Sequence, residues 1–115
     1  MHISPLYKIK QQFDAASIED VKGVVGRQFE QFRAGDKTLP GQSVAVAVAS
    51  RGTHDLTPLV AAVIERLLAV GLKPYIIPAM GSHGGATGSG QTQVLADLGI
   101  SEETMGVPVV SSMDV

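Results

Sequence analysis

Cysteine is absent from this chain of 115 residues. Its absence excludes disulfide bonds, zinc sites built from thiolates and a cysteine nucleophile. Charge is also scarce, because charged residues make up 17% of the chain, against about 25% in an average soluble domain. The 9 basic residues do not outnumber the 11 acidic ones, so no basic excess supports binding to a nucleic-acid backbone.

Long apolar runs are missing as well. The longest, Val44–Ala49 and Leu59–Ile64, are far shorter than the roughly 20 residues that a membrane helix needs. The N-terminus lacks the basic and then apolar run of a secretory signal. We therefore expect a cytoplasmic protein with no membrane partner. Apolar residues still make up 44% of the chain, which is enough to build a core and argues against intrinsic disorder.

The first half of the chain predicts one helix and one strand. Apolar residues recur at spacings of three and four between Ser17 and Gly35, and Ser17 with Asp20 resembles a capping box. This pattern predicts a helix over 17–35. Valine alternates with alanine over Gln42–Ser50, so both faces of this segment are apolar. It is predicted to be a strand that is covered on both sides.

The second half continues the alternation of helices and strands. Thr57 and Pro58 begin an apolar helix that Gly71 ends. A short strand over Tyr75–Ile77 follows, then a glycine-rich loop (Gly81–Gly88), a helix over 89–98, one helical turn from Ser101 and a strand over Val107–Val110. This order predicts an α/β fold, a Rossmann-like βαβαβ unit with a short parallel sheet. Residues 1–40 form a leading segment and 41–115 the core of a single domain, which we expect to be an incomplete N-terminal part of a larger one.

Two polar segments follow the first two predicted strands. In open parallel sheets, ligands bind beyond the carboxyl ends of the strands. The topology therefore brings two sets of side chains toward one crevice. They are Arg51, Thr53 and His54 after the first strand, and His83 and Thr87 after the second.

The glycine-rich loop carries the strongest chemical signal. Five glycines lie between Gly81 and Gly90, and glycine lets backbone N–H groups turn toward a ligand. A helix N-terminus directly afterwards favours an anion. His83 is a candidate proton acceptor and Arg51 a clamp for a carboxylate or phosphate. The loop matches neither a P-loop nor the G-x-G-x-x-G fingerprint, so a glycine-rich connector without a ligand stays open.

Simpler roles also remain open for single residues. Arg51 can pair with Asp55, Asp55 and Thr57 can cap the second helix, and Thr87 can cap the third. A zinc site of His54, His83 and Asp55 is conceivable, but the spacing is not diagnostic.

Two segments carry a resemblance to a known family. SRGTHDLTP at 50–58 and PAMGSHGGAT at 78–87 resemble the N-terminal domain of the lactate racemase (LarA-like) family. These isomerases are racemases and epimerases of 2-hydroxy acids and related sugar or polyol acids, and they depend on a nickel-pincer nucleotide. Gly84 follows His83 where the racemase itself has arginine, so the resemblance does not specify lactate as the substrate.

The resemblance implies a role for several residues. His83 matches the histidine that takes the proton of the substrate hydroxyl while hydride passes reversibly to the cofactor. Arg51 matches an arginine beside substrate and cofactor, and Thr53, Gly84, Gly85 and Thr87 fall where the cofactor is contacted. The second histidine, the cofactor-attaching lysine and the nickel-binding histidine of the family are expected beyond Val115, so no metal ligand is assigned in this chain.

Two other functions remain alternatives. The glycine-rich loop, a helix N-terminus and Arg51 would suffice for a non-catalytic module that binds an anion or a nucleotide. A stable fragment without activity would have an open sheet edge and could associate with copies of itself.

Overall fold

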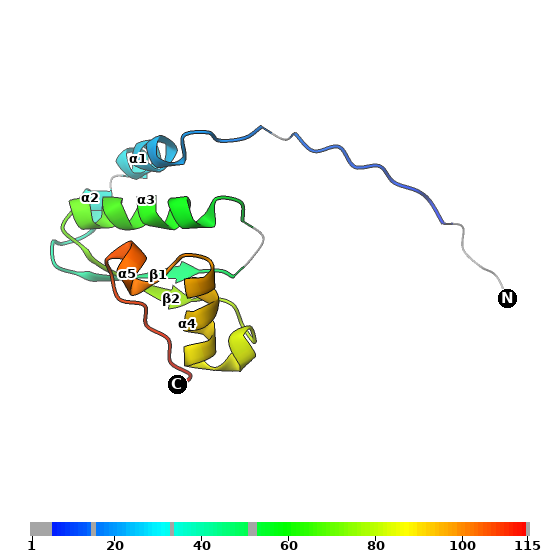
Figure 1. Cartoon of the computed structure of the whole chain (residues 1–115). Coiled ribbons are helices and arrows are strands. Elements are labelled where there is room, and N and C mark those ends of the chain that lie inside the picture. Colours follow the sequence, from blue (N-terminus) through cyan, green and yellow to red (C-terminus); the bar gives the residue numbers. More distant parts are fainter. Residues whose placement is uncertain (1–5, 15, 33, 51–52, 115) are drawn as a thin grey trace.

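A β–α–β unit forms the centre of the protein. The computed structural model describes residues 6–14, 16–32, 34–50 and 53–114. Strand β1 (Ser43–Val48), helix α3 (Leu56–Ala69) and strand β2 (Lys73–Pro78) follow one another, and the two strands pair in parallel with Ser43 beside Lys73 (Figure 1). The predicted α/β class is therefore confirmed in its coarse form, as a mixed fold with a parallel sheet.

The other elements lie before and after this unit. Helix α1 (Val21–Phe32) and the short turn α2 (Ala34–Lys37) precede β1. A 3₁₀ turn (Gly84–Ala86), helix α4 (Gly88–Asp97) and the short helix α5 (Glu102–Met105) follow β2. None of the helices in the described ranges is long and apolar enough to cross a bilayer.

The sheet buries only one of its two faces. Val44, Val46 and Val48 of β1 point to the same face as Ile76 of β2, because Val46 pairs with Ile76 and side chains alternate along a strand. Val48 and Ile76 are buried there, whereas Ala45 and Ala47 are exposed on the opposite face. The prediction that β1 is covered on both sides is therefore wrong.

The connections between the strands explain this one-sided cover. Residues of both α3 and α4 belong to one buried cluster with Val48 and Ile76; they include Val60, Ile64 and Leu95. Two successive right-handed crossovers that move in the same direction across a sheet place both helices on the same face. The alanine face consequently receives no helix among the described elements.

The predicted third strand is reduced to a single bridge. Val109 pairs in parallel with Ile76, and the Val110 N–H donates to the Ile76 carbonyl at 2.8 Å. Residues 107–110 therefore lie beside β2, as expected, but the ladder does not extend into a strand. Conversely, β2 is longer than the predicted Tyr75–Ile77, since it includes both flanking prolines, Pro74 and Pro78.

Helix α1 begins later than predicted. Its first residue is Val21, and the Asp20 carboxylate accepts a hydrogen bond from the Gly23 N–H at 2.8 Å. Asp20 therefore occupies the capping position that the sequence assigned to Ser17. The helix ends at Phe32, and the Lys37 ammonium lies 4.0 Å from the centre of the Phe32 ring.

Helix α3 is covered by α1 as well as by the sheet. The two helices pack together, and Lys22 of α1 forms an ion pair of 2.8 Å with Glu65 of α3. Cover by α1 on one side and by the sheet on the other explains why the helix is apolar around much of its circumference. Gly71 ends α3 as predicted, with a left-handed backbone and the Leu72 N–H bonded to the Leu67 carbonyl. Thr57 does not cap the helix, because its hydroxyl donates to the Leu98 carbonyl at 2.7 Å.

Neighbouring isoleucines test the one-sided packing. Ile76 is 0% exposed on the helix-covered face, so Ile76→Ala should lower the free energy of unfolding by about 2–5 kcal/mol. Ile77 is half-buried on the alanine face, and Ile77→Ala should cost about 1 kcal/mol. Urea denaturation followed by circular dichroism measures both values. Equal losses would contradict a sheet that buries one face.

The Lys22–Glu65 ion pair predicts a pH dependence. The hydrogen bond from Lys22 lowers the pKa of Glu65 below its ordinary value of 4.5. A carboxyl with a lowered pKa stabilises the fold above the unfolded pKa, and this contribution is lost as the pH falls through the folded pKa. Lys22→Met should therefore raise the pKa of Glu65 in an NMR titration of the side-chain carboxyl. Lys73→Met, a control outside this pair, should leave it unchanged, and an unchanged pKa in Lys22→Met would refute the pairing.

Candidate functional site

The loops that follow β1 and β2 meet at one point. Ser50 lies two residues after β1, and its hydroxyl oxygen is 2.5 Å from Nδ1 of His83, which follows β2. The carboxyl ends of parallel strands lie at the same edge of a sheet, so the residues beyond them become neighbours. The predicted convergence of the two segments is confirmed for this pair. Both residues are half-buried, and the imidazole is therefore held rather than free in solvent.

The contact defines what each nitrogen of His83 can do. When Nδ1 carries the proton, it donates to the Ser50 oxygen and Nε2 presents a lone pair. When Nδ1 accepts from the Ser50 hydroxyl, Nε2 carries the proton instead. In either state the second nitrogen remains for a ligand, because Ser50 occupies only the first. The arrangement suits proton transfer to or from a bound hydroxyl.

Three backbone hydrogen bonds shape the glycine-rich loop. The Ala79 N–H donates to the Val48 carbonyl at 2.8 Å and ties the start of the loop to the end of β1. The His83 N–H then donates to the Met80 carbonyl at 3.3 Å, and the Ala86 N–H to the His83 carbonyl at 3.2 Å. These two tight turns place His83 between them, so the position of its side chain follows from the loop backbone.

Gln91 supports the loop from helix α4, a role that was not predicted from the sequence. Its side chain is 5% exposed, and its amide nitrogen donates to the Gly81 carbonyl at 2.7 Å. Because a buried polar group needs a partner, this hydrogen bond both satisfies the amide and holds the start of the loop.

Thr87 caps helix α4, one of its two predicted roles. Its hydroxyl accepts from the Gly90 N–H and donates to the Gly84 carbonyl, both at 3.1 Å. Gly84 and Gly90 are so close that a Cβ on Gly84 would lie under 3.0 Å from the backbone of Gly90. Both hydrogen-bonding functions of Thr87 are thus used within the loop. Only glycine can occupy position 84 without displacing the start of α4.

The other residues predicted to contact a cofactor are Gly85, Thr53 and Arg51. Gly85 is exposed, has a left-handed backbone, and would have open space around an added Cβ. Thr53 is exposed as well. Arg51 lies outside the described residues. Of the five residues predicted to hold a cofactor, Gly85 and Thr53 are therefore exposed, whereas Gly84 and Thr87 make contacts within the loop.

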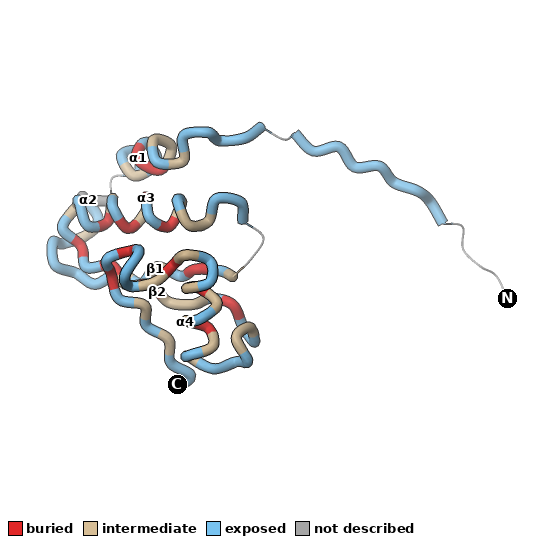
Figure 2. Tube along the Cα trace, in the orientation of Figure 1, coloured by how far each residue is buried: buried red, intermediate tan, exposed pale blue. Residues whose placement is uncertain are grey.

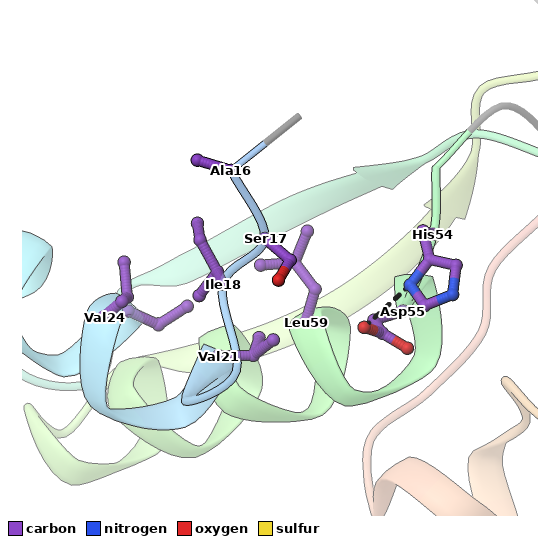
Figure 3. A pocket seen from close by; sticks show the side chains of 9 residues that line it. Ala16, Ser17, Ile18, Val21, Val24, His54, Asp55 and Leu59 are labelled. Carbon is purple, nitrogen blue, oxygen red and sulfur yellow. Dashed lines mark ion pairs between the residues drawn. The ribbon is translucent and has the colours of Figure 1, made fainter. Parts of the chain in front are cut away.

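His54 lies in a different place from His83. Its Nδ1 is 2.8 Å from the Asp55 carboxylate, and the pair lies at one end of an apolar pocket of about 450 Å³ between α1 and the start of α3 (Figure 3). Asp55 is the N-cap of α3 but its side chain makes no capping bond. His83 does not line this pocket. In the described part of the chain no three His, Asp or Glu side chains are close enough to hold a metal ion, so the zinc site is not formed there.

Comparison with protein-family models, with curated proteins and with solved structures found no match. The resemblance to the lactate racemase family consequently depends on the two segments at 50–58 and 78–87 alone.

Adjacent glycines test the geometry of the loop. Gly84 and Gly85 have similar positive φ angles of 63° and 67°, so alanine at either position should cost about 1–2 kcal/mol of backbone strain. Gly84→Ala should cost roughly 1–3 kcal/mol more, because the new Cβ would displace the start of α4. Thermal unfolding of both variants measures the difference. Equal stability of the two variants would show that the loop does not pack against α4 in this way.

Proposed function

We propose that this chain is the N-terminal part of a nickel-pincer-nucleotide-dependent racemase or epimerase that acts on a 2-hydroxy acid or a related sugar acid. The observation that carries the proposal is the contact between Ser50 and His83 beyond the carboxyl ends of β1 and β2. This edge is where parallel sheets bind their ligands. The two segments that resemble the family are also the two that meet there.

His83 has the central role in this proposal. With the Nδ1 proton donated to Ser50, Nε2 accepts the proton of the substrate hydroxyl and later returns it. Ser50 is a positioning residue, because its contact with Nδ1 holds the imidazole ring and leaves Nε2 as the nitrogen for the substrate. Arg51 would bind the substrate carboxylate through two parallel hydrogen bonds.

The cofactor would supply the hydride chemistry when bound. In the proposal, the exposed backbone at Gly85 and the hydroxyl of Thr53 contact its anionic group. In the proposal, the second histidine, the attaching lysine and the nickel-binding histidine of the family lie outside these 115 residues. The fragment alone is therefore not expected to turn over substrate.

A histidine pair tests the proposed base. In the longer protein, produced together with the enzymes that make the cofactor, His83→Gln should reduce racemisation about a hundredfold or more. His54→Gln is the matched control, since His54 lies at the separate pocket, and it should retain activity near the parent level. Chiral chromatography of a panel of 2-hydroxy acids measures turnover, and metal analysis measures bound nickel.

Two results would contradict the proposal. Activity of His83→Gln near the parent level would exclude this histidine as the base. A parent protein without nickel and without racemisation, but with phosphate binding that His83→Gln leaves unchanged, would identify an anion-binding module instead.

A further inference from the structure

The residues before α1 have the pattern of a strand that lacks a partner. We term residues 6–13 the arm. From residue 7 on, the odd positions hold Tyr7, Ile9 and Phe13 together with one polar residue, Gln11, whereas the even positions hold Lys8, Lys10 and Gln12. A strand over 7–13 would therefore have one mainly apolar face, which Gln11 interrupts, and one polar face. Tyr7, Ile9 and Phe13 are 82%, 86% and 75% exposed, so their apolar face is almost entirely in solvent.

The arm makes no contribution to the core of its own chain. No residue before Val25 belongs to the set of buried side chains among the described residues. The arm extends away from the helices and the sheet as a long, exposed segment (Figures 1 and 2). Three large apolar side chains on one face of such a segment are costly to leave in water.

Strand β1 has a free edge that could accept such a strand. The described sheet has two strands, and Val109 bridges to β2, so the far edge of β1 has no strand beside it. The Gln42 carbonyl accepts from the N–H of Lys73, the first residue of β2, and the Val48 carbonyl accepts from the N–H of Ala79, which follows β2. Backbone groups alternate between the edges of a strand, so the N–H and C=O groups of Ala45 and Ala47 point to the free edge.

The core is also incomplete beside this edge. Val44 and Val46 point to the helix-covered face, yet they are only half-buried, whereas Ile76 in the neighbouring strand is 0% exposed. A strand added next to β1, with its apolar face on the same side, would cover these valines. The charges are also compatible, because the first 13 residues hold two lysines and no acid, whereas residues 14–115 carry a net charge of −4.

We propose that the arm of a second copy of this chain pairs with the free edge of β1, and that two chains exchange their arms in a symmetric dimer. Tyr7, Ile9 and Phe13 lie beside Val44 and Val46 under the helices, and the lysines face outward. Each chain both gives an arm and receives one, so the assembly closes at two copies. This inference is independent of the proposed function, because it concerns the edge of β1 that does not pair with β2.

Two substitutions at different ends of the contact test the dimer. Ile9→Asp places a charge on the apolar face of the arm. Ala47→Pro removes an N–H that points to the free edge, and prolines are tolerated on edge strands. Ala61→Ser is the control, because Ala61 is an exposed residue of α3. Circular dichroism and thermal unfolding show whether each variant is folded before its mass is measured.

Sedimentation equilibrium of the 115-residue chain gives the result. The parent and Ala61→Ser should have twice the 12.0 kDa mass of one chain. Ile9→Asp should raise the dissociation constant by about tenfold or more, and folded Ala47→Pro should do the same. A parent that is monomeric at all concentrations, or a dimer that Ile9→Asp leaves equally tight, would overturn the proposal. If Ala47→Pro does not fold, Ile9→Asp decides alone, since the arm makes no core contact.

Discussion

The pairing of β1 with β2 is the constraint on which the remaining structure depends. Both strands present their buried side chains to one face, and Ile76 at the middle of that face lies in the same buried cluster as residues of α3 and α4. The parallel direction makes both strands end at one edge. The bond between Ala79 and Val48 then fixes where the glycine-rich loop begins, and Ser50 comes next to His83 as a consequence. The candidate site is thus a product of strand pairing, although neither of its side chains is deep in the core.

Local signals in the sequence predicted the elements that local bonds determine. Thr87 at the start of α4, Gly71 at the end of α3 and Ser101 before α5 were all expected near their observed positions. These features depend on residues three or four positions apart, so a short window of sequence contains the relevant information. The start of α1 was missed because Ser17 and Asp20 are both residue types that cap helices, and the structure shows that Asp20 accepts the capping bond from the Gly23 N–H.

Longer-range features were harder to predict. The valine and alanine pattern of β1 indicated two apolar faces. The number of covered faces, however, depends on whether the second crossover connection moves across the sheet in the same direction as the first. The third strand forms only its bridge to Ile76, and the extent of a ladder depends on partners far away in sequence. Convergence of the two loops could be predicted from topology alone. The support that Gln91 gives to the Gly81 carbonyl could not, because it needs the loop backbone in place.

The site therefore combines a well-defined imidazole with a loop whose glycines mostly serve its own packing. Gly84 and Thr87 make their contacts within the loop, whereas Gly85 and Thr53 are exposed and Ser50 contacts only one nitrogen of His83. The most direct measurement is an NMR spectrum of the chain with the His83 ring and the Ser50 side chain assigned. The account predicts nuclear Overhauser contacts between the Ser50 methylene protons and the His83 ring. A His83 ring without such contacts, and with the rapid averaging of a side chain free in solvent, would contradict it.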